Sequence, residues 1–90
     1  MQSFPADAAS IDAVKSALRR LIEENAGIPG SSVRDESTID GDLAMDSFSF
    51  VSLQVAMEET FGVSITPEEI EEQHRFDAIA SLIQERLTHG

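Results

Sequence analysis

The sequence predicts an all-α protein: a four-helix bundle with three main helices, one short helix and a long first loop. Three observations predict this fold. Apolar residues recur at helical spacing, capping residues and glycines bound those segments, and no stretch alternates with period two for long enough to form a convincing strand. Ninety residues suffice for one domain. We expect residues 10–88 to form the bundle and residues 1–9 to form a flexible tail.

The first helix is expected from Ser10 to about Asn25. Ser10 is a suitable N-cap, and Gly27 supplies the C-terminal stop. The apolar residues of this segment lie on one helical stripe, which should face the core. They are Ile11, Val14, Leu18, Leu21 and Ile22.

Residues 26–45 have the composition of a loop, rich in glycine, serine and proline. A loop of about 20 residues is long for a compact domain, and such loops are usually functional or disordered. Aliphatic residues nevertheless recur through this one. We therefore expect it to be held against the core by Ile28, Val33, Ile39 and Leu43.

The second helix is expected over residues 47–61, with Asp46 as its cap and Gly62 as its stop. Val51 and Val55 flank its apolar stripe. The sequence leaves open whether they fill the core or form an apolar contact beside an acidic face. The stripe itself consists of Phe50, Leu53, Met57 and Phe61.

Two more helices follow. Residues 66–69, Thr-Pro-Glu-Glu, form a capping box with proline at the first helical position, which predicts a short helix to about Glu72. The last helix is expected from about Phe76 to Leu87. Its inward-facing residues should be Phe76, Ile79, Leu82, Ile83 and Leu87.

The charge balance indicates what the protein binds. Seventeen acidic residues against six basic ones leave a net charge of −11. Such a surface repels nucleic acid and anionic lipid, and it attracts proteins with basic patches. Cysteine is absent, which excludes disulfides and thiol catalysis. Neither a membrane span nor a secretion signal is recognisable, so we expect a monomer in the cytoplasm.

Ser47 could be a hydrolytic nucleophile, but its surroundings do not favour that chemistry. A G-x-S-x-G elbow is absent, because Met45 and Ser49 flank it at the glycine positions. The candidate bases are His74 and His89, and the sequence places neither beside Ser47. We expect His74 to be exposed or to cap a helix end, and we expect no enzyme.

Asp40, Asp42 and Asp46 crowd together like calcium ligands. An EF-hand loop that began at Asp40 would need oxygen ligands at its fifth and twelfth positions and glycine at its sixth. Those positions hold Ala44, Val51 and Met45. We therefore expect no metal site.

Two stretches together resemble the acyl carrier protein family. Residues 42–48 read DLAMDSF and residues 57–69 read MEETFGVSITPEE. The family pattern is an aspartate, a leucine and an Asp-Ser-Leu motif, then an acidic helix that ends in Glu-Glu-x-Phe-Gly, and then a Pro-Glu turn. The resemblance extends over residues 11–87.

The resemblance implies a function for Ser47. In this family the serine hydroxyl carries phosphopantetheine through a phosphodiester, and a magnesium-dependent phosphopantetheinyl transferase installs the group from coenzyme A. Acyl groups are then bound as thioesters to the terminal thiol of phosphopantetheine. Asp46 and, more weakly, Asp42 match positions that help the transferase to dock. Acyl-loading and acyl-processing enzymes with basic patches are the other implied partners, and we expect them to contact Phe48, Val51, Val55, Glu58 and Glu59.

The chain also departs from the family pattern. Ala44 replaces the usual glycine, Phe48 replaces leucine, and Ser49 and Ser52 replace acids that many fatty-acid carriers show. These departures favour a specialised fatty-acid- or polyketide-type pathway, and Asp46 before the serine fits a discrete acyl carrier. The alternatives are a peptidyl or aminoacyl carrier, or an unmodified helical interaction module.

Overall fold

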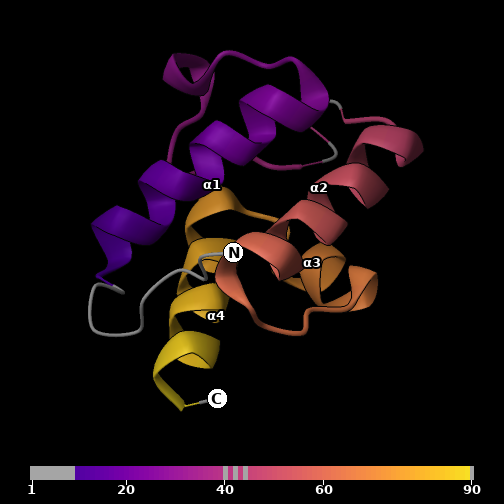
Figure 1. The fold of residues 1–90 in the computed structure, drawn as a ribbon. Coiled ribbons are helices and arrows are strands. Elements are labelled where there is room, and N and C mark those ends of the chain that lie inside the picture. Colours follow the sequence, from indigo (N-terminus) through magenta and orange to yellow (C-terminus); the bar gives the residue numbers. More distant parts are fainter. Residues whose placement is uncertain (1–9, 40, 42, 44, 90) are drawn as a thin grey trace.

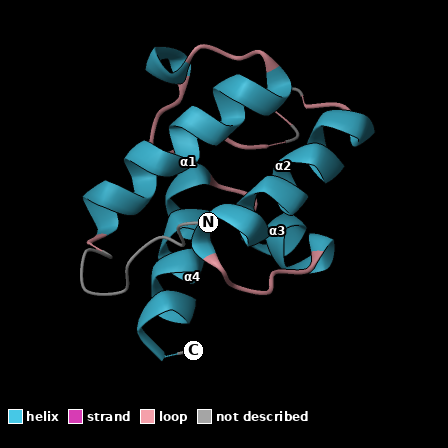
Figure 2. Cartoon of the chain, in the orientation of Figure 1, coloured by secondary structure: helices cyan, strands magenta, loops and turns pink. Residues whose placement is uncertain are grey.

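The computed structural model describes residues 10–39, 41, 43 and 45–89. Figures 1 and 2 show an all-helical arrangement, as predicted, and no strand occurs among the described residues. The predicted tail, residues 1–9, lies outside the described part. The elements are α1 (Ile11–Ala26), the 3-10 turn η2 (Gly30–Ser32), α2 (Ser47–Phe61), α3 (Pro67–Gln73) and α4 (Phe76–His89).

The helices begin and end where the predicted capping residues stand. The side chains of Ser10, Asp46 and Thr66 each accept a hydrogen bond from the backbone N–H three residues later, and Thr66 takes part in a complete capping box. Gly27 and Gly62 end α1 and α2 in the left-handed conformation, with φ of 70° and 69°. The caps therefore confirm the predicted boundaries to within two residues.

One core holds the helices together. α1 packs against α2 and α4, and α3 packs against α4 (Figure 1). The core includes the predicted loop residues Val33, Ile39 and Leu43, whereas Ile28 is only partly buried against it. The largest fully buried side chains come from all four helices and from the loop that joins α2 to α3: Phe61, Phe76, Leu18, Ile22, Leu53, Met57, Ile65, Ile70, Ile79, Ile83 and Val14.

The long connection from α1 to α2 is held by hydrogen bonds as well as by its aliphatic residues. The Ile39 N–H donates to the His74 carbonyl at 3.0 Å, and the Phe76 N–H donates to the Ser37 carbonyl at 2.8 Å. Both bonds join the connection to the turn between α3 and α4. Arg19 adds a further tether, because its Nε donates to the Val33 carbonyl at 3.1 Å. The connection is thus fixed from two sides.

Arg86 of α4 joins the beginning of α3 to the preceding loop. Its guanidinium pairs with both carboxylate oxygens of Glu69 and donates to the Ser64 carbonyl at 2.6 Å. The hydrogen bonds from Arg86, and then the one from the Thr66 N–H, lower the pKa of Glu69 to about 2 from 4.5. The pair thus favours the ionised form of Glu69 in the folded protein.

This pair predicts a pH-dependent contribution to stability. Because the folded state lowers the pKa of Glu69, the contribution is complete above the unfolded value of 4.5 and is lost as the pH falls through about 2. We therefore expect the difference in thermal midpoint between the wild type and Glu69→Gln to be largest near neutral pH and to shrink between these two values. Glu68→Gln removes a neighbouring exposed carboxylate as a control. A difference that stays constant down to pH 2 would contradict the role of the pair.

Candidate functional site

Ser47 is the first residue of α2, and its side chain is exposed to solvent. The preceding residue fixes the start of this helix: Asp46 Oδ1 accepts a hydrogen bond from the Ser49 N–H at 2.8 Å. That bond is the main reason why the pKa of the Asp46 carboxyl lies below its usual value. The cap thus holds the hydroxyl of Ser47 at the positive end of the helix, and that end favours a covalently attached anion.

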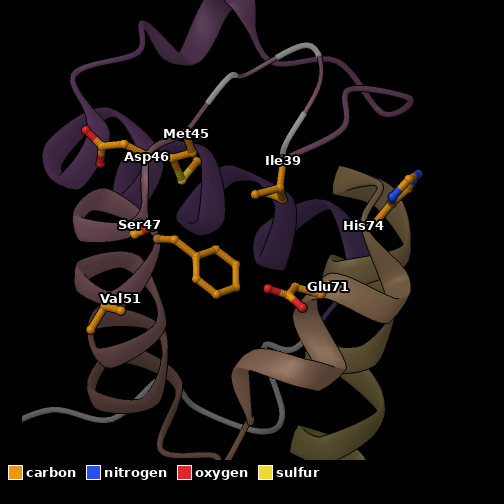
Figure 3. Close-up of a pocket in the computed structure, with 8 residues that line it drawn as sticks. Ile39, Met45, Asp46, Ser47, Val51, Glu71 and His74 are labelled. Carbon is orange, nitrogen blue, oxygen red and sulfur yellow. The ribbon is translucent and has the colours of Figure 1, made fainter.

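A cavity of about 560 Å³ adjoins Ser47. Figure 3 shows it between the beginning of α2, the long connection and the end of α3. Its size falls within the range of small-molecule sites. A group on the Ser47 hydroxyl can therefore extend into solvent or turn into this space. The lining residues are Ile39, Met45, Asp46, Ser47, Phe50, Val51, Glu71 and His74.

The site shows no arrangement for hydrolysis. His74 is exposed and ends α3, as predicted, and in Figure 3 its side chain points away from Ser47. No hydrogen bond is recorded between the Ser47 hydroxyl and a basic group of the described residues. Among these residues no group of three histidines or carboxylates is placed to hold a metal ion. The described helices are also too short or too polar to cross a bilayer.

Comparison with known proteins identifies the family. The model of the phosphopantetheine attachment site family matches residues 16–83, which is more than half of the chain. An acyl carrier protein from Acidothermus cellulolyticus is 43% identical over 63 residues, which cover 70% of this chain and 75% of that protein. An acyl carrier protein from Thermobifida fusca is 33% identical over 67 residues, which cover 74% of this chain and 85% of that protein. The chain belongs to the acyl carrier protein family.

Family membership establishes the general function. The protein is a carrier and not an enzyme, and its prosthetic group is phosphopantetheine. Carriers of this kind interact with a phosphopantetheinyl transferase and with enzymes that handle acyl groups. The residues present fit the group, because an exposed hydroxyl stands at a helix start that stabilises a phosphodiester. The thiol that the cysteine-free chain lacks is supplied by phosphopantetheine when it is bound.

The structure decides the position of the two valines that the sequence left open. Val51 and Val55 are 52% and 45% exposed, and Phe48 is 82% exposed. Their spacing of three and four residues places them one above another on α2, directly after Ser47. We call these three residues the apolar row. It lies on the outside of the carrier, beside Ser47.

The two acids at the far end of α2 have different environments. Glu58 is partly buried, and its Oε2 accepts hydrogen bonds from Gln54 Nε2 and from the Ile65 N–H, each at 3.1 Å. Glu59 is exposed. Glu58 therefore stabilises the loop after α2, and Glu59 remains accessible to a partner. Asp42, the weaker of the two predicted transferase contacts, lies outside the described residues.

Most of the cavity wall was not predicted from the sequence. The apolar stripe of the second helix predicts Phe50 as a core residue, but the structure buries it only partly and places it in the cavity wall. Phe50 packs against the edge of the core, and because α2 has apolar residues on more than one face, periodicity did not show which of them is fully buried. The position of Glu71 in the cavity wall was not predictable either. It is one of several glutamates in α3, and periodicity does not show which of them faces a cavity.

Proposed function

We propose that Ser47 is the attachment site of phosphopantetheine, and that the protein carries acyl groups as thioesters on that arm. The observation that supports this assignment is the exposed hydroxyl at the first position of α2, held there by the Asp46 cap and next to a cavity. Other serines of α2 lack this combination, since Ser49 and Ser52 lie within the helix and are partly buried.

The attachment is a phosphoryl transfer to Ser47. The hydroxyl oxygen of Ser47 forms a bond to the pantetheine-bearing phosphorus of coenzyme A and gives up its proton. The pyrophosphate P–O bond breaks, and adenosine bisphosphate leaves. No described residue beside Ser47 is placed to act as a catalytic base for this step, so the transferase and its magnesium ion should take the proton and stabilise the developing charge. The chain itself contributes a fixed, solvent-accessible nucleophile position.

Mass spectrometry tests the assignment. We expect incubation with a broad-specificity phosphopantetheinyl transferase, magnesium and coenzyme A to add one phosphopantetheinyl group, and peptide mapping to place it on Ser47. A group on another serine would overturn the choice of residue. No mass gain with several transferases would instead favour an unmodified interaction module.

We further propose that partner enzymes dock on the apolar row, with Asp46 and Glu59 beside it. Partners should present basic side chains around an apolar patch, because the carrier has a net charge of −11 and the row itself is uncharged. A carrier that visits several enzymes needs small, short-lived contacts. It should also work as a monomer, because self-association through the row would hide it, and in the cytoplasm, where coenzyme A is supplied.

The pathway should be a specialised fatty-acid or polyketide type. Phe48 gives the row a large aromatic side chain immediately after Ser47, and Ser49 and Ser52 leave the first turns of α2 without acids other than the cap. Contact with partners near the arm should therefore depend more on apolar area than on charge. Enzymes selected for this carrier would then match an aromatic side chain at that point.

Two variants separate apolar from electrostatic docking. Val55→Asp should lower kcat/KM for acyl transfer about five- to thirty-fold at any ionic strength, because it places a charge in the apolar contact. Glu59→Lys should lower it only at low salt. Glu85→Lys, the same charge change on an exposed residue of α4, is the control. Full activity of Val55→Asp, together with a salt-dependent loss in Glu59→Lys, would contradict docking through the row.

A further inference from the structure

Glu71 is a carboxylate that faces the cavity next to Ser47 without a recorded partner. It lies near the end of α3, is exposed, and lines the cavity. In Figure 3 its side chain points from α3 across the cavity toward α2. The structure records no hydrogen bond or ion pair between Glu71 and any other described residue. Its oxygens are therefore free to accept hydrogen bonds from a group in the cavity.

The other polar groups of the cavity are less suited to that task. Asp46 uses its carboxylate to cap α2 and points away from Glu71 (Figure 3). The His74 side chain is directed outward. Ile39 and Met45, from the long connection, make the facing wall apolar. The cavity thus combines an apolar wall with one carboxylate aimed into it.

We propose that Glu71 selects the cargo: the carrier favours acyl groups that bear an amino group or another hydrogen-bond donor over plain alkyl chains. This inference rests on the proposed attachment at Ser47. An alkyl chain that covers Glu71 removes water from a charged group and offers no hydrogen bond in return, which is unfavourable. A donor restores that bond, and a cationic donor makes it stronger. The apolar wall meanwhile accommodates the methylene groups of the same cargo.

The expected selectivity is moderate, because Glu71 is exposed to solvent. Exposed ion pairs change an equilibrium by about two- to five-fold. Selection at this level changes the fraction of time that a cargo spends inside the cavity. It would protect a donor-bearing group during transport between enzymes and leave an alkyl group more accessible.

Three matched cargoes test the proposal. The carrier is loaded from coenzyme A analogues with six-carbon acyl chains that end in an ammonium, a methyl or a carboxylate group, joined by an amide so that they neither hydrolyse nor cyclise. The readout is the fraction of cargo inside the cavity, from nuclear Overhauser effects between the chain and the methyl groups of Ile39 and Met45. Intact mass confirms loading of each sample.

Comparison with Glu71→Gln isolates the carboxylate. We expect this variant to lower the occupancy of the ammonium cargo about two- to five-fold and to raise that of the carboxylate cargo. The occupancy of the methyl cargo should rise slightly, because covering a neutral amide costs less than covering a carboxylate. Glu72→Gln, the same change on an exposed neighbour that does not line the cavity, should alter none of them. If all three loaded cargoes respond alike to Glu71→Gln, the proposal is overturned. If no sample gains mass, the proposed attachment at Ser47 is contradicted, and the proposed selection of cargo, which rests on it, is contradicted as well.

Discussion

Ser47→Ala should abolish loading with phosphopantetheine completely while the fold persists. The hydroxyl is exposed, and Asp46 rather than Ser47 caps α2, so its removal should cost at most about 0.5–1 kcal/mol of unfolding free energy. The variant should therefore melt within a few degrees of the wild type. Intact mass after incubation with the transferase and a thermal melt by circular dichroism measure the two effects.

Ser52→Ala is the matched control, because it removes a hydroxyl from the next turn of the same helix. It should load fully. Loading of Ser47→Ala at the wild-type level would refute the attachment site. Unfolding of Ser47→Ala would show that the serine is structural, and the loss of loading would then carry no information about the site.

Leu53→Ala should have the largest effect on stability. Leu53 is 1% exposed and lies in the core between the capping region and the far end of α2. Removing a fully buried leucine side chain costs about 2–5 kcal/mol, because the cavity left behind collapses only partly. For a domain of this size we expect a fall in thermal midpoint of roughly 10–30 °C. Chemical denaturation measures the change in unfolding free energy directly.

Alanine variants of two other residues of α2 provide a comparison for the stability change of Leu53→Ala. Val55→Ala should change stability by less than about 0.5 kcal/mol, since Val55 is 45% exposed. Phe50→Ala should fall between the two, because Phe50 is only partly buried and borders the cavity. An unchanged midpoint for Leu53→Ala would mean that a different face of α2 packs against the core.

Local chemistry made the helix boundaries predictable. Ser10, Asp46 and Thr66 satisfy free N–H groups of the turn that follows each of them, and Gly27 and Gly62 adopt a left-handed conformation that other residues disfavour. These effects act within a few residues, so the sequence contains them in full. The exposed position of Ser47 follows from the same cap.

The orientation of α2 was less predictable. A helix with one apolar stripe has one buried face, whereas α2 carries apolar residues around most of its surface. Periodicity correctly identified Leu53 and Met57 as buried. It left the burial of Val51 and Val55 undecided and overestimated that of Phe50. Which side of such a helix faces outward depends on where α1 lies, and that is a property of the packed bundle.

By itself, the sequence determined the helices, their caps, most of the core and the family, and with them the function of a carrier. Only the tertiary structure decided which side chains meet across the fold. In the folded chain Glu58 accepts a hydrogen bond from the loop before α3, and Glu69 pairs with Arg86. The side chain of Glu71 points into the cavity beside Ser47. In each case several acidic residues of similar local sequence were available. Contacts between residues distant in the chain depend on the relative positions of whole helices, which local periodicity does not specify.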